Sequence, residues 1–73
     1  MAPVYQIIEI SVDADGNEGV RRPSWSFDTR EKSVNRINNL LSRCKLGRFD
    51  KEKGYWLCTA MNDDRTHFMI EAI

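Results

Sequence analysis

One histidine and two cysteines are the side chains of this chain best suited to nucleophilic catalysis or to soft metal binding: His67, Cys44 and Cys58. No Cys-x-x-Cys or His-x-x-His spacing joins them, so the sequence gives no support for a zinc site. Cys44 falls on the apolar stripe of a predicted helix, where burial keeps a thiol protonated and inert. His67 could approach Cys58 across a hairpin, but no orienting group or oxyanion donor accompanies the pair. We therefore expect a protein that is not an enzyme, with no catalytic residue, no cofactor and no bound metal.

A cluster of acidic and amide residues at 13–17 resembles the opening of a calcium loop, because oxygen-bearing side chains stand at alternate positions. An EF-hand loop also needs glycine at its sixth position and glutamate at its twelfth, whereas those positions hold Glu18 and Ser24. Asp and Asn bond to nearby backbone and Gly tolerates positive φ, so the same residues suit a turn. We interpret the cluster as the turn of a hairpin.

Basic residues are concentrated in the middle of the chain. Lys32, Arg36 and Arg43 follow a spacing that places them on one stripe of a helix, and Arg48 comes shortly after it. Cations held along one rigid ridge could meet the phosphates of a nucleic acid. The alternative interpretation is an ordinary solvated helix face, which amphipathic helices show routinely.

The elements that would position these residues are one helix and four strands. The strands are predicted at 4–12, 20–27, 55–61 and 66–72. The helix is predicted at 29–46, because its apolar residues recur at helical spacing: Val34, Ile37, Leu40, Leu41 and Cys44.

Local signals mark the ends of these elements. Asp28 with Glu31 has the form of a capping box, with Thr29 as a second candidate cap. Gly47 is predicted to end the helix in a left-handed conformation, and residues 48–54 to form a charged connection. Pro23 cannot donate a ladder hydrogen bond, so its strand must lie at an edge or carry a bulge.

These elements predict one domain over residues 1–73. The fold class is α+β with the order ββαββ, in which one helix packs on one face of a four-stranded, mainly antiparallel sheet. A chain of 73 residues can bury one small core. The strand order and the central strands stay open at this point.

The face of the sheet that the helix does not cover is expected to hold large apolar side chains. The first strand is apolar on both sides, and in the third strand either Leu57 or Trp56 must face outward. One interpretation is scattered surface hydrophobes, which are common. The other is a docking face for a protein, with these candidate residues: Tyr5, Ile7, Tyr55, Trp56 and Met69.

Composition limits the function classes. The chain is 41% hydrophobic and 30% charged, which suits a folded domain, and its zero net charge argues against a general polyanion binder. Two cysteines are too few for a disulfide scaffold, so we expect reduced thiols and a cytoplasmic protein. The N-terminus does not have the form of a signal peptide, and no apolar run approaches the ~20 residues of a membrane helix.

We expect a small binding protein that acts through contact with an unidentified protein partner, as an adaptor or inhibitor. A phage or another mobile element is one origin that this size allows. Two further hypotheses remain beside it. One is RNA or single-stranded DNA binding through the basic residues Lys32, Arg36, Arg43 and Arg48. The other is a homodimer joined through sheet faces or edges.

Overall fold

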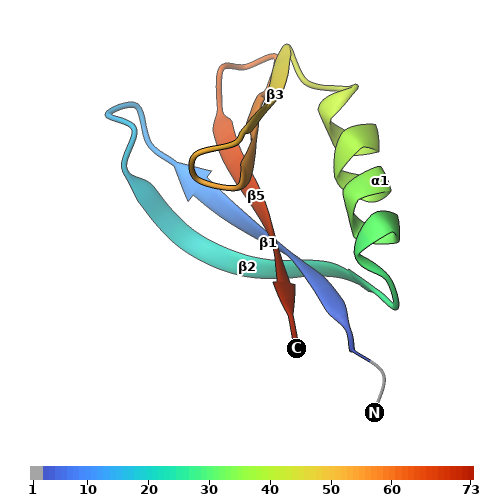
Figure 1. Ribbon diagram of the computed structural model, residues 1–73. Coiled ribbons are helices and arrows are strands. Elements are labelled where there is room, and N and C mark those ends of the chain that lie inside the picture. Colours follow the sequence, from blue (N-terminus) through green and yellow to red (C-terminus); the bar gives the residue numbers. More distant parts are fainter. Residues whose placement is uncertain (1–2) are drawn as a thin grey trace.

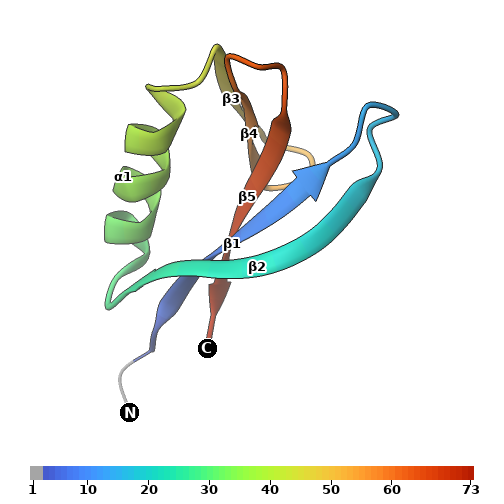
Figure 2. The same cartoon turned by 180° about the vertical axis from the view of Figure 1, so that it is seen from behind.

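The computed structural model describes residues 3–73 and shows one helix against one antiparallel sheet of five strands. The elements follow the order ββαβββ (Figures 1 and 2). Their bounds are β1 Tyr5–Val12, β2 Glu18–Phe27, α1 Arg30–Leu41, β3 Leu46–Asp50, β4 Tyr55–Thr59 and β5 Arg65–Ala72. The predicted α+β class is confirmed, whereas the predicted number of strands is wrong by one.

The strand order is β2-β1-β5-β4-β3, and every neighbouring pair is antiparallel. The first and last strands of the chain are therefore neighbours inside the sheet, and β2 and β3 form its edges. Pro23 lies on edge strand β2, opposite Ile8, next to a register irregularity. An edge strand tolerates proline because its outer backbone groups need no ladder partner.

The core lies between α1 and one face of the sheet. Ile37 of the helix is fully buried against Ile7 of β1, Trp56 of β4 and Phe68 of β5. Partly buried side chains surround this cluster, among them the predicted helix-stripe residues Val34, Leu40 and Leu41. The prediction that this stripe faces the sheet is confirmed. Each fully buried Ile or Phe contributes about 1.5–3 kcal/mol by leaving water.

The start of α1 is fixed by two polar side chains. Thr29 is the N-cap, and its hydroxyl accepts a hydrogen bond from the Lys32 backbone N–H at 3.2 Å. The prediction that Asp28 caps the helix is therefore wrong, and the alternative prediction of Thr29 is confirmed. Asp28 instead pairs with the Lys32 side chain at 2.9 Å, and this hydrogen bond, together with the charge of Lys32, lowers the pKa of Asp28.

Ser33 holds the helix close to the sheet. Its side chain is fully buried, and its hydroxyl donates a hydrogen bond to the backbone carbonyl of Tyr5 at 3.0 Å. A larger side chain at this position would separate α1 from β1. The hydrogen bond links the helix directly to the backbone of β1.

The helix ends at Leu41, five residues earlier than predicted. The Lys45 backbone N–H already bonds to the Thr59 carbonyl at 2.8 Å, and β3 begins at the next residue. Gly47 is therefore not a helix stop. It has no positive φ, and its Cα passes so close to Leu41 that an added Cβ would lie 3.0 Å from the Leu41 Cβ.

A disulfide joins Cys44, in the segment after α1, to Cys58 of β4, with their Cα atoms 5.9 Å apart. This distance lies in the ordinary range for disulfides. The expectation of two reduced thiols is wrong for this structure. The bond ties the end of the helix and the start of β3 to the sheet.

Candidate functional site

The face of the sheet opposite α1 is defined by the strand register. Trp56 and Phe68 are paired and face the helix, so their chain neighbours Leu57 and His67 are paired on the opposite face. The same row continues through Ile10 of β1 to Arg21 of β2. We call this surface the open face.

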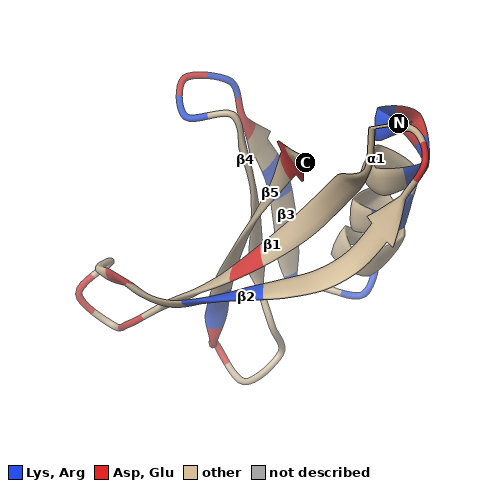
Figure 3. Ribbon diagram, turned by 90° about the horizontal axis from the view of Figure 1, so that it is seen from below, with Lys and Arg blue, Asp and Glu red and all other residues tan. Residues whose placement is uncertain are grey.

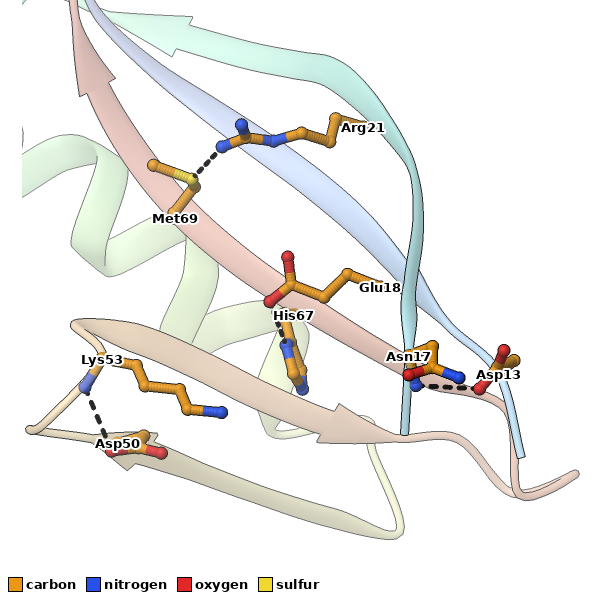
Figure 4. A network of polar contacts seen from close by, with 8 residues as sticks. All are labelled: Asp13, Asn17, Glu18, Arg21, Asp50, Lys53, His67 and Met69. Atoms are coloured by element: carbon orange, nitrogen blue, oxygen red, sulfur yellow. Dashed lines mark hydrogen bonds and ion pairs between the residues drawn. The ribbon is translucent and has the colours of Figure 1, made fainter. Parts of the chain in front are cut away.

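Part of the open face is covered by side chains that reach across it from β2 and β5. Because β1 lies between β2 and β5, a contact from β2 to β5 must cross over β1. Two such contacts exist (Figure 4): the Arg21 guanidinium lies 2.8 Å from the Met69 sulfur, and the Glu18 carboxylate lies 3.6 Å from His67 Nδ1. Ile10, between them on β1, is fully buried. The apolar surplus of β1 is thus covered by polar side chains of the neighbouring strands.

Beyond these contacts the open face is hollowed into a groove of ≈ 620 Å³. Three apolar side chains line it, which we call its floor: Val12, Leu46 and Leu57. Four charged side chains also line it, which we call its wall: Arg48, Asp50, Lys53 and Arg65. Gly16 of the β1–β2 loop is a further lining residue. The volume lies within the range of protein ligand pockets, about 300–1,000 Å³.

Cations outnumber carboxylates along the groove. Asp50 is its only carboxylate-bearing lining residue, and one Asp50 oxygen accepts the backbone N–H groups of Glu52 and Lys53. Among residues 3–73, Arg48 and Lys53 form no ion pair. The β1–β2 loop, by contrast, is acidic (Figure 3), and its Asp13 carboxylate accepts two backbone N–H groups of its own turn. The groove is therefore cationic on its β3–β4 side.

His67 is one of the residues that line the groove, and within residues 3–73 its buried Nδ1 has no hydrogen-bond partner. Its side chain is 16% exposed, and its ring centre lies 5.7 Å from that of Tyr55. The 3.6 Å separation from Glu18 is too long for a hydrogen bond. Cys58, which could have been its nucleophilic partner, is tied up in the disulfide.

The five residues predicted to bind protein do not share one face. Tyr55 and Met69 lie on the open face, each half-buried. Ile7 and Trp56 lie in the core beneath the helix, and Tyr5 lies on the same side of β1 as Ile7. The placement of these three on a free surface is corrected, because β1 turns its odd-numbered side chains toward α1.

The four residues predicted to bind nucleic acid are also divided. Lys32 is paired with Asp28, and the Arg36 guanidinium lies over the Trp25 ring, 4.3 Å from its centre. Arg43 is exposed after the end of α1. Arg48 lies on the open face, on the other side of the sheet from the helix. The predicted basic ridge thus contains two residues that already have partners on their own surface.

Sequence reasoning missed the groove as a unit. Val12, Lys53 and Arg65 come from three segments that are distant in sequence, and only the strand order brings them together. The alternation of side chains in β4 indicates that Leu57 could face outward, and this is the sequence feature that points toward the groove.

The structure and the comparisons add three further findings. Within residues 3–73 no group of three or more His, Cys, Asp or Glu side chains is arranged to hold a metal ion. In the same part of the chain no helix has the length and apolar character that a bilayer span requires. Comparisons with protein-family models, curated proteins and solved structures gave no match.

Proposed function

We propose that this chain is a non-enzymatic binding protein that holds a segment of a partner protein in the groove of the open face. The observation that carries the proposal is the groove itself, which is lined by both apolar and charged side chains. Protein interfaces combine these two parts, with an apolar centre and a polar rim. An adaptor or an inhibitor would act in this way, by occupying its partner.

The shape of the open face favours a partner over a second copy of this chain. A twofold dimer must use the same patch on both subunits. Two copies apposed through this face would set hollow against hollow and leave space between them, whereas good interfaces are closely packed. Homodimerisation through the edges of β2 or β3 remains a separate prediction.

Nucleic-acid binding through the helix has weaker support. Arg36 already stacks on Trp25 and Lys32 already pairs with Asp28, so a phosphate would compete with contacts within the chain. Reversing Arg36 and Arg43 to Glu tests this alternative. Loss of binding to an RNA or DNA oligonucleotide would support it, and absence of binding by the unaltered chain at low salt would remove it.

The proposed protein-binding function is tested by filling the groove. Peptides are selected from a random displayed library on the unaltered protein and then measured against Thr59→Trp, which places a large ring among the groove residues. Asn39→Trp, on the exposed helix surface, is the matched control. We expect Thr59→Trp to abolish binding and Asn39→Trp to preserve it, with both variants checked for folding. Peptides that bind both variants equally, or a selection that yields none, would contradict the proposal.

A further inference from the structure

We infer that the groove is selective for an acidic peptide segment that also carries a large apolar side chain. This inference rests on the proposed function and names the chemical class of its ligand. Two observations support it: the charged residues that line the groove, and the apolar residues of its floor.

Three cationic side chains line the groove. Arg48, Lys53 and Arg65 face it, and all three are exposed. Arg65 uses one N–H in a hydrogen bond to the Ala14 carbonyl at 3.0 Å, which leaves other guanidinium donors free. In Figure 4 the Lys53 side chain extends from its turn over the sheet, with the amino group directed toward His67. A ligand in the groove would lie among these donors.

Among the charged lining residues, one carboxylate, that of Asp50, stands against three cations, and one of its oxygens accepts backbone N–H groups of the β3–β4 turn. The nearby Asp13 carboxylate accepts backbone N–H groups of the β1–β2 loop. An anionic ligand in the groove would meet more cations than carboxylates. The groove therefore complements negative charge, even though the whole chain has a net charge of zero.

The floor explains why the ligand should be a peptide. Leu46 is 67% exposed, and Leu57 and Val12 are half-buried, so apolar side chains line the groove together with the cations. An aliphatic or aromatic side chain of a peptide would cover this surface while neighbouring Asp or Glu residues reach the wall. A nucleic acid would instead need aromatic platforms for its bases, and the floor residues are aliphatic.

The test compares synthetic peptides of equal length and equal apolar content, in which the remaining residues are acidic, uncharged or basic. Binding to the unaltered protein is measured by titration calorimetry and located by amide chemical shifts. We expect the acidic peptide to bind most tightly and to shift the signals of Leu57 and Arg48. An oligothymidylate serves as a second polyanion.

A pair of charge reversals isolates the groove. Lys53→Glu changes a residue that lines the groove, whereas Lys51→Glu makes the same change in the same turn outside it. Exposed ion pairs contribute up to about 1 kcal/mol, a factor of about five in affinity. We expect Lys53→Glu to weaken the acidic peptide by up to about fivefold, and Lys51→Glu to change its affinity by less than about twofold.

The outcomes separate this inference from the proposed function. Peptides that bind the groove without preference for acidic residues would overturn the inference and leave the function standing. Peptides of all three kinds that fail to bind would overturn both. Tighter binding of the oligothymidylate in the groove, or equal losses from Lys53→Glu and Lys51→Glu, would also overturn the inference.

Discussion

The bond between Cys44 and Cys58 makes the sharpest prediction about stability. The two cysteines are 14 positions apart in sequence. Closing a loop of about 15 residues in the unfolded chain is worth about 3 kcal/mol in the chain-entropy account of disulfides. For a domain of this size each kcal/mol corresponds to about 4–8 °C in the unfolding midpoint. Reduction should therefore lower the midpoint by about 12–24 °C.

The assay is thermal unfolding followed by far-ultraviolet circular dichroism, with and without a phosphine reductant. The double variant Cys44→Ser/Cys58→Ser is the control, and it should match the reduced protein and show no response to reductant. Coincident midpoints for the oxidised and reduced protein would refute the reasoning. A bond of this kind persists in oxidising compartments and is reduced in the cytosol, so the same measurement shows how stable the chain is in each. The expected cytoplasmic location stays a prediction.

Substitutions test three further contacts, of which two are hydrogen bonds and one is a packing contact. Ser33→Ala should lower the free energy of unfolding by about 1 kcal/mol in urea titrations, because the hydrogen bond between the helix and the Tyr5 carbonyl is lost; an unchanged value would mean that water replaces the hydroxyl. Thr29→Ala should cost about 1 kcal/mol through loss of the helix cap, whereas Asp28→Ala, which leaves the cap in place, should cost less, and the reverse order would identify Asp28 as the cap in solution. Gly47→Ala should destabilise the protein because the added methyl group meets Leu41, and combining it with Leu41→Ala should recover part of the loss; independent, additive losses would exclude this contact.

The helix and four of the strands could be predicted because their patterns are local. Val34, Ile37, Leu40 and Leu41 repeat at helical spacing, and the structure packs this stripe on the sheet. Edge strand β3 could not be predicted in the same way. Its sequence, Leu-Gly-Arg-Phe-Asp, contains no β-branched residue, and only its pairing with β4 makes it a strand.

The disulfide and the open face depend on contacts between distant segments. Cys44 comes within reach of Cys58 only because the helix ends at Leu41 and the segment after it is hydrogen-bonded to β4. The first strand is apolar on both sides, so its sequence does not indicate which side faces the helix. The helix packs against Ile7, so Ile8 and Ile10 take the other side. A single sequence does not show which side packs against the helix. The residues predicted to bind protein are therefore split between the core and the open face.

The measurement that most directly tests the account is paramagnetic relaxation of side-chain methyl groups by a soluble gadolinium chelate. If α1 covers one face of the sheet and the other stays open, the methyl groups of Leu46 and Leu57 should relax rapidly, whereas those of Ile7 and Ile37 should be protected. Protection of Leu46 and Leu57 in the isolated chain, or rapid relaxation at Ile7 and Ile37, would contradict it.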